Sequence, residues 1–299
     1  MRRTRLVLVP VAAALLLSAC GSSSSGGTTS SSAAATASES ASESASPSAT
    51  CSPESLETLN AGKLTIATGE PVFPPWMLDD DPTSGKGFES AVAYAVAKQL
   101  GYDNADVTWV RTTFDSAIAP GPKTFDFNIQ QYSITDERKK VVDFSSGYYA
   151  LSQVVISNES SPIAKATTVA ELKGARLGAA IGTTSLKAIE EQIQPTEKAQ
   201  VFNDNAAAVT ALKNKQIDGI VVDLPTAFYL AFVEIDKGVI VGQLPDSAAA
   251  NEQLGLLLAK DSPITQCVSG AVDALREDGT LAALEKEWLA DQGAPVLAP

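Results

Sequence analysis

The chain has 299 residues, a formal net charge of −13 from 22 Lys and Arg against 35 Asp and Glu, and no histidine. The absence of histidine excludes Ser-His-Asp and Cys-His catalysis, His-ligated zinc and imidazole acid–base chemistry. The excess of acidic residues argues against nucleic acid and anionic lipid as partners, because Lys and Arg provide most of the attraction to both.

Residues 1–19 predict a secretory signal peptide. Three arginines within residues 1–5 precede an apolar run over 6–17, and small residues follow up to Cys20. This run is shorter than the about 20 residues that span a bilayer. The sequence Leu-Ser-Ala-Cys-Gly at 17–21 resembles the bacterial lipobox, which implies cleavage before Cys20 and a lipid on that cysteine. An ordinary signal peptide with a chance cysteine is the alternative.

Residues 20–50 predict a flexible tether that begins at the lipid-bearing Cys20. From residue 21 to residue 50 the chain contains only Gly, Ser, Thr, Ala, Glu and Pro. Such a segment cannot bury enough apolar surface to offset the entropy that is lost on ordering. Because no later segment is long and apolar enough to span a bilayer, we expect the lipid on Cys20 to be the membrane attachment.

Two further cysteines, Cys51 and Cys267, lie far apart in the expected folded part. In an exported chain a cysteine pair is more often a disulfide than a metal site. We therefore predict a Cys51–Cys267 disulfide that links the start of the folded part to a C-terminal helix. Two unrelated thiols are the alternative.

Strands and helices alternate from residue 64 onward, and the length is sufficient for one large domain or two medium lobes. Apolar residues at helical spacing over 88–100 predict a helix that stops at Gly101. The alternation indicates an α/β fold with a largely parallel sheet. The expected strands cover 64–67, 107–110, 125–129, 141–144, 154–156, 176–181, 201–202, 217–222, 239–241 and 255–258. The other expected helices cover 169–173, 184–193, 205–214, 225–233, 262–276 and 280–289.

The most informative motif is the run Ser-Ile-Thr-Asp-Glu-Arg-Lys-Lys-Val-Val-Asp-Phe-Ser at 133–145, with Tyr148 and Tyr149 after it. It resembles the family 3 solute-binding proteins of ABC importers, which are receptors for polar amino acids. The resemblance extends over residues 62–289. Further family motifs occur in order at 87–89, 172–174, 178–184, 217–223 and 275–280.

The resemblance implies a two-lobe, periplasmic-binding-protein-like α/β fold with two chain crossovers (type II) and a ligand cleft between the lobes. On that basis residues 62–150 plus 243–299 form lobe 1, and residues 151–242 form lobe 2. A ligand that contacts both lobes favours their closure by a hinge motion. We expect a monomer whose closed form docks on the membrane subunits of an ABC permease.

Three places in the chain have the chemistry to bind the two charges of an amino acid. Arg138 can hold a carboxylate with two parallel hydrogen bonds, as the arginine of this motif does in the family; a solvated charge in a helix capped by Thr135 is the alternative. Thr183 and Thr184 open a helix whose free N–H groups suit the same carboxylate. Asp223 ends a strand, and the resemblance implies that it holds the ammonium; an N-cap is the alternative.

Aromatic side chains are expected to enclose the ligand. Phe73 and Trp76 occupy the first pocket loop of the family, and Phe114 occupies the second. The alignment of the first loop is ambiguous by one residue, so either Val72 or Phe73 faces the ligand. The resemblance also places Ser133 in the cleft.

Departures from the family pattern bear on the class of ligand. Gln131 aligns with a position that touches ligand, so its amide is expected to line the site. Gly69 stands where receptors for cationic amino acids often have an aspartate, and Ala180 and Ile181 stand where some members have a lysine. These differences favour an uncharged polar or acidic amino acid over Lys or Arg.

The sequence thus indicates an extracellular substrate-binding lipoprotein that captures an amino acid and delivers it to an ABC permease. We expect it on the extracellular face of the bacterial cytoplasmic membrane, or in the periplasm, without cofactor, metal or catalytic residues. The acidic run 79–81 lacks the central Gly and terminal Glu of an EF-hand loop and predicts a solvated turn. Two alternatives are a ligand-sensing lipoprotein without transport and a cyclohexadienyl or arogenate dehydratase-like enzyme, for which Glu70 is the available acid.

Overall fold

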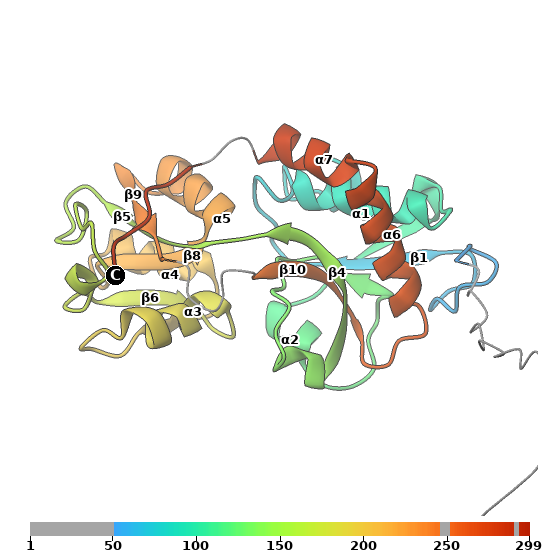
Figure 1. Cartoon of the computed structure of the whole chain (residues 1–299), viewed down its shortest axis with the longest axis horizontal. Coiled ribbons are helices and arrows are strands. Elements are labelled where there is room, and N and C mark those ends of the chain that lie inside the picture. Colours follow the sequence, from blue (N-terminus) through green and yellow to red (C-terminus); the bar gives the residue numbers. More distant parts are fainter. Residues whose placement is uncertain (1–50, 246–251, 290–292) are drawn as a thin grey trace, which may run out of the picture. The chain divides into compact units, whose positions relative to one another are not determined.

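Two five-stranded mixed sheets with helices packed on them form the folded part of the chain (Figure 1). The computed structural model describes residues 51–245, 252–289 and 293–299. The expected signal peptide, the lipidation site Cys20 and the tether over 20–50 all lie outside the described residues. Within the described ranges, no helix is both long and apolar enough to cross a membrane.

The part of the chain built on the first sheet is called lobe 1. In this sheet β1 pairs in parallel with β2 and β3, whereas β10 pairs antiparallel with β3 and β4. The strand order across the sheet is β2 (Val107–Arg111), β1 (Leu64–Thr68), β3 (Phe127–Asn128), β10 (Gln253–Ala259) and β4 (Val142–Ala150).

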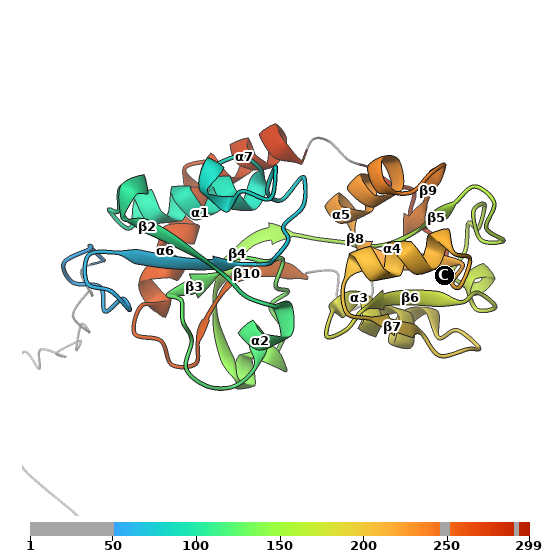
Figure 2. The same cartoon turned by 180° about the vertical axis from the view of Figure 1, so that it is seen from behind.

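Helices cover both faces of the lobe 1 sheet. One face carries α1 (Phe88–Gln99), α6 (Thr265–Glu277) and α7 (Thr280–Trp288), which contact one another, and α2 (Phe114–Ile118) lies on the other (Figures 1 and 2). Successive side chains of β10 point to opposite faces of the sheet, so this strand contributes to the hydrophobic core on each face. Leu256 joins the core under α1 and α6, and Leu257 joins the core of α2. The loops of this lobe contain the 3-10 helices η1 (Pro82–Ser84), η2 (Asn104–Asp106) and η3 (Arg138–Lys140).

The part of the chain built on the second sheet is called lobe 2. In this sheet β6 pairs in parallel with β7 and β8, whereas β5 pairs antiparallel with β8 and β9. The strand order is β7 (Gln200–Phe202), β6 (Leu177–Ala180), β8 (Gly219–Asp223), β5 (Gln153–Asn158) and β9 (Gly238–Gln243). The chain passes between the lobes from β4 to β5 and from β9 to β10.

Two α-helices of lobe 2 continue as π-helices. The expected helix over 184–193 is α3 (Thr184–Ala188) followed by η5 (Ile189–Ile193), and the expected helix over 225–233 is α5 (Leu224–Tyr229) followed by η6 (Leu230–Glu234). The remaining helices of this lobe are α4 (Asn205–Lys213) and the 3-10 helix η4 (Ala170–Leu172). Each strand and helix expected from the sequence has a counterpart in the structure, with shifted ends.

The sheets are mixed, although four of the five strands in each run in the same direction, as expected for a largely parallel sheet. In each sheet one strand runs against the other four: β10 in lobe 1 and β5 in lobe 2. The reason is topological. These two strands carry the chain into their lobe, so they begin at the sheet edge where the other strands end.

The C-terminal residues 293–299 lie on lobe 2, although the sequence assigned them to lobe 1. Gln243 N donates to Pro295 O at 2.8 Å, and Leu297 N donates to Gln243 O at 2.9 Å. Leu297 is only 2% exposed and packs where Gly242 has no Cβ, since a Cβ there would come within 2.8 Å of it. The end of the chain is accordingly marked beside lobe 2 in Figure 1. The chain thus enters lobe 2 again after α7, in addition to the two crossovers between strands.

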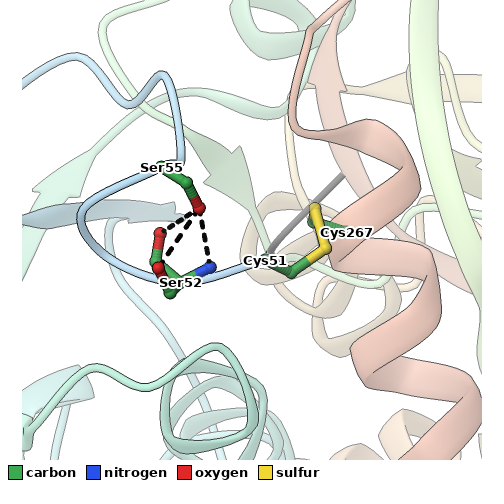
Figure 3. Close-up of a disulfide and its surroundings, with 4 residues drawn as sticks. All are labelled: Cys51, Ser52, Ser55 and Cys267. Atoms are coloured by element: carbon green, nitrogen blue, oxygen red, sulfur yellow. Dashed lines mark hydrogen bonds between the residues drawn. A yellow bond between two sulfur atoms is a disulfide. The ribbon is translucent and has the colours of Figure 1, made fainter. Parts of the chain in front are cut away.

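The predicted disulfide is present in the structure. Cys51 and Cys267 are separated by 216 residues and their Cα atoms by 5.5 Å. Figure 3 shows Cys267 on α6 and Cys51 at the start of a turn in which Ser52 and Ser55 hydrogen-bond to each other. The bond therefore joins the first described residue to the helical face of lobe 1.

Candidate functional site

A cavity of about 560 Å³ lies between lobe 1 and lobe 2. Its walls come from the loops that follow β1, β2 and β3 in lobe 1 and β6, β7 and β8 in lobe 2. The carboxyl ends of parallel strands are the usual ligand-binding edge of α/β sheets. Both sheets turn this edge toward the same cavity, which makes it the candidate site.

The structure brings the residues expected at the site to this one cavity. All of them line it, and so do residues that the sequence did not single out, including Gln130, Gln153 and Tyr229. Their role in binding a ligand remains a prediction. The expected residues that line the cavity are Phe73, Trp76, Phe114, Gln131, Ser133, Arg138, Thr183, Thr184 and Asp223, together with Val72.

Arg138 is a buried cation whose side chain is fixed in direction. It is 8% exposed; its Nη1 donates to Ser133 O at 2.8 Å, and its Nη2 donates to Gly182 O of lobe 2 at 2.9 Å. The guanidinium lies over the Phe114 ring, 5.3 Å from its centroid. Thr135 does cap the backbone of Arg138, but the side chain is not the solvated charge of the alternative reading. Its remaining N–H groups have no acceptor among the described residues and can hold a carboxylate.

The hydroxyl groups of the two lobes meet beside Arg138. Ser133 Oγ of lobe 1 lies 3.2 Å from Thr184 Oγ1 of lobe 2, and Gln153 Nε2 donates to the same Thr184 oxygen at 3.3 Å. Thr183 has a different role, because its Oγ1 accepts from Leu186 N at 3.2 Å and caps α3. The side chain of Thr183 is thus committed to the helix, whereas Ser133 and Thr184 present exchangeable hydrogen bonds to the cavity.

Asp223 supplies a negative charge from lobe 2. It ends β8, and its Oδ1 accepts from Thr226 N at 3.0 Å as the N-cap of α5. Burial raises the pKa of Asp223 to about 6, against the hydrogen bonds to Thr226, which lower it. The cap and the cavity position are compatible, because a carboxylate has two oxygens and about four lone pairs. An ammonium group beside Asp223 would favour its charged form.

Of the three aromatic residues expected at the site, Trp76 and Phe114 are held by contacts with other side chains, whereas Phe73 is exposed. Trp76 is 3% exposed and donates from Nε1 to Thr226 Oγ1 of lobe 2 at 2.9 Å. Phe114 stacks on Tyr132 with 4.6 Å between ring centroids. Phe73 is 40% exposed, and its ring lies 6.3 Å from that of Tyr229 across the lobe boundary. Phe73 therefore belongs to the rim of the cavity.

Gln131 lines the cavity as expected. Its amide nitrogen, however, is already hydrogen-bonded within the protein and is not available to a ligand. Both its backbone N and its Nε2 donate to the carboxylate of Glu89, which also accepts from the Tyr148 hydroxyl. Gln131 adopts a left-handed backbone conformation (φ 51°) that these bonds hold in place. Burial raises the pKa of the fully buried Glu89 to about 7. Glu89 thus supports the turn that leads from β3 to Ser133.

The described residues contain no group of three or more His, Cys, Asp or Glu side chains that could hold a metal ion. The acidic run 79–81 has other contacts. Asp80 pairs with Arg111 at 2.9 Å, and Asp81 accepts from Thr83 N at 2.9 Å to cap η1. This arrangement agrees with the turn that the sequence predicts.

Hydrogen bonds across the cavity show that the lobes are in contact. They join Arg138 to Gly182, Trp76 to Thr226 and Ser133 to Thr184. Fold and site together define a two-lobed α/β binding protein whose cavity is enclosed by both lobes.

Comparison with known proteins identifies the family. Residues 64–291 match the family model of bacterial extracellular solute-binding proteins, family 3. Since this match covers most of the chain, the protein belongs to that family. The fold class and the family expected from the sequence motifs are both confirmed.

The chain is similar to proteins that are named for binding amino acids. It is 31% identical over 219 residues to ABC transporter arginine-binding protein 1 of Escherichia coli K12, which covers 72% of this chain and 86% of the relative. It is 28% identical over 228 residues to the L-cystine-binding protein TcyJ of the same organism, covering 75% and 82%. A crystal structure of the ancestral amino acid-binding protein AncCDT-1, described as a precursor of cyclohexadienyl dehydratase, matches with a TM-score of 0.62 and 29% identity, covering 76% and 95%.

Proposed function

We propose that this protein captures a free amino acid between its lobes and delivers it to the permease of an ABC importer. One observation carries the proposal: Arg138 of lobe 1 and Asp223 of lobe 2 have opposite charges and line the same cavity. The carboxylate and ammonium of a free amino acid each need an opposite charge when they leave water. A cavity of about 560 Å³ is also within the usual range of about 300–1,000 Å³ for small-molecule sites.

Ligand binding is coupled to closure of the lobes in this proposal. The carboxylate partner comes from lobe 1 and the ammonium partner from lobe 2, so one ligand holds the lobes together. A ligand shifts an equilibrium by its differential affinity for the two states, and only the closed state offers both partners. The closed form is then the one that docks on the permease.

The attachment to the cell follows from the sequence. A lipid on Cys20 and the tether over 20–50 would hold the protein at the extracellular face of the bacterial cytoplasmic membrane. The folded part would act there as a monomer. The sequence favours an uncharged polar or acidic amino acid as ligand, and the relatives named above are called binding proteins for arginine and for cystine.

The residues of the cavity support a dehydratase-like activity less well than they support amino-acid binding. An enzyme of that kind needs an acid held near the reacting group. Glu70 lines the cavity, but its side chain is exposed and receives no hydrogen bond from a described residue. Nothing in the described part of the chain therefore positions Glu70 for proton transfer, and a binding protein without catalysis fits the site better.

Titration calorimetry of the purified protein against the twenty amino acids tests the proposal. We expect at least one amino acid to bind, and Arg138→Met to weaken it at least about 30-fold, because a buried charge pair that loses one partner costs about 2–5 kcal/mol. Asp223→Asn should weaken it by a similar factor. Lys139→Met is the matched control, since Lys139 is next in the chain and its side chain is 53% exposed. Normal binding by both site variants would refute the proposed site.

A further inference from the structure

Gln130 lines the cavity but is not among the residues proposed to bind the carboxylate or the ammonium group of the ligand. Gln130 and Gln131 are neighbours in the turn after β3, and both line the cavity. The Gln131 amide nitrogen is bound to Glu89, as described above. The Gln130 Nε2, in contrast, has no hydrogen-bond acceptor among the described residues, so it is available to a ligand.

Tyr132 fixes the orientation of the Gln130 amide. The Tyr132 hydroxyl lies 2.9 Å from Gln130 Oε1 and 3.3 Å from Phe114 O, so the amide oxygen is its nearer acceptor. This hydrogen bond leaves the two N–H groups of Gln130 on the other side of the amide. Tyr132 itself is fully buried, and its ring is stacked on Phe114. A rigid aromatic residue thus holds the amide in one direction.

Gly69 makes room for this amide. Gly69 follows β1 and also lines the cavity. A Cβ at position 69 would lie 2.6 Å from Gln130 Nε2, closer than real Cβ atoms approach. The amide of Gln130 therefore occupies the space above Gly69 that a larger residue would fill, and its N–H groups lie at the end of β1.

The remaining charges of the cavity argue against an acidic ligand side chain, and the Gln130 amide argues against a cationic one. Apart from Arg138 and Asp223, the charged residues among the described lining residues are four acids and one lysine. This excess of negative charge opposes an acidic side chain. A cationic side chain would meet the N–H groups of Gln130, which repel it. The four acids and the lysine are Glu70, Asp115, Asp204, Glu234 and Lys213.

Three of these acids have contacts within the protein, so they are less available to a cationic side chain than carboxylates without such contacts. Asp204 caps α4 by accepting from Ala207 N at 2.8 Å, and Glu234 accepts from the Tyr229 hydroxyl at 2.8 Å. Asp115 lies against Gly182, where a Cβ would come within 2.6 Å of its Oδ1. Burial lowers the pKa of the Arg138 guanidinium, and the charge of the nearby Asp115 opposes that shift. Only Glu70 is left without a contact of this kind in the described structure.

We infer that Gln130 determines specificity by donating a hydrogen bond to the ligand side chain, and that the ligand is an amino acid whose side chain carries a neutral carbonyl group, of the primary-amide class. This inference rests on the proposed function and names the substrate class of the same site. Of the classes that the sequence favours, it retains the uncharged polar ligand and rejects the acidic one.

Calorimetry with four ligands tests the inference. Glutamine, glutamate, arginine and norleucine share the zwitterion and have chains of similar reach. The wild-type protein is expected to bind glutamine more tightly than the other three. Gln130→Met keeps the length of the side chain and removes its donor. It should lower the preference for glutamine over norleucine by about two- to tenfold, because one hydrogen bond contributes about 0.5–1.5 kcal/mol.

Two further variants separate a hydrogen bond from a general disturbance of the fold. Tyr132→Phe removes only the hydroxyl that orients the amide, and it should lower the same preference while norleucine binds as before. Gln99→Met, at the exposed end of α1, should leave all four affinities unchanged. Tighter binding of arginine or glutamate by the wild type, or an unchanged preference in Gln130→Met, would overturn the inference while the proposed function stands. Failure of every amino acid to bind would overturn both.

Discussion

Lobe 1 and lobe 2 share one sheet plan but secure their chain ends differently. Each has five strands of which one is reversed. Lobe 1 is secured covalently, because the disulfide joins Cys51 to Cys267 of α6. Lobe 2 contains no cysteine, and the C-terminal residues 293–299 secure it through backbone hydrogen bonds and the buried Leu297. The attachment of the chain end therefore depends on redox conditions in lobe 1, and on backbone hydrogen bonds and the packing of Leu297 in lobe 2.

The largest difference between the lobes should appear on reduction. Removing both cysteines in Cys51→Ser/Cys267→Ser should lower the free energy of unfolding of lobe 1 by about 2–4 kcal/mol, because the unfolded chain regains a long open loop. Differential scanning calorimetry with and without reductant measures this. Reductant should shift the wild type and not the double variant. A wild-type transition that reductant leaves in place would contradict the disulfide as a stabilising link.

A smaller effect is expected from the end of the chain on lobe 2. Leu297→Ala should lower the free energy of unfolding by about 2–3 kcal/mol, since a buried leucine loses its contacts and leaves a cavity. The neighbouring Val296→Ala is the matched control, because Val296 is 63% exposed and should change stability by less than about 0.5 kcal/mol. Chemical denaturation of both variants gives the comparison. Equal losses in the two would mean that the tail does not secure lobe 2.

The smallest effect concerns the charge that lobe 2 brings to the cavity. The pKa of Asp223 is raised from 3.8 to about 6, so folding disfavours its ionised form. The contribution of Asp223 to stability is present below pH 3.8 and is lost as the pH rises to about 6. Ligand-free Asp223→Asn should therefore be about 1–2 kcal/mol more stable than the wild type at pH 7, because asparagine keeps the cap of α5.

The control for this prediction is Asp278→Asn. Hydrogen bonds from the side chain of Thr280 and from its backbone N, the latter at 2.8 Å, lower the pKa of Asp278. The charged form is favoured in the folded protein, so this variant should gain no stability at neutral pH. Thermal unfolding of both variants from pH 4 to pH 7.5 gives the profiles. A gain for Asp278→Asn equal to that for Asp223→Asn would show that the effect is not due to burial of Asp223.

The resemblance of the sequence motifs to the family, more than local patterns alone, placed much of the site. Arg138 and Asp223 lie in motifs whose spacing determines where they fall relative to a helix or a strand end. Both line the cavity as expected. The apolar runs predicted the strands, because most of them bury at least one face; β2 and β7, which contain no fully buried residue, are the exceptions. These features depend on neighbours in the chain, and neighbours can be read from the sequence.

Features that depend on distant contacts could not be predicted in this way. The difference between Gln130 and Gln131 arises from Glu89, which lies on α1 and binds the second amide. The final residues 293–299 show no helical or strand periodicity of useful length, and their partner Gln243 is far away in the chain. The direction of β5 and β10 follows from where the chain enters each lobe, which no local pattern records.

The hydrogen bond between Trp76 and Thr226 should make the tryptophan fluorescence of the protein sensitive to the position of the lobes. Trp76 is one of three tryptophans in the chain. The indole N–H of Trp109 is bonded to Tyr94 within lobe 1, and that of Trp288 is buried without a partner in the described structure. Only the Trp76 indole, among these three, is bonded to the opposite lobe. Separation of the lobes would break this hydrogen bond and expose the indole to water. The intrinsic tryptophan fluorescence of the protein should therefore report whether the lobes are apart or closed.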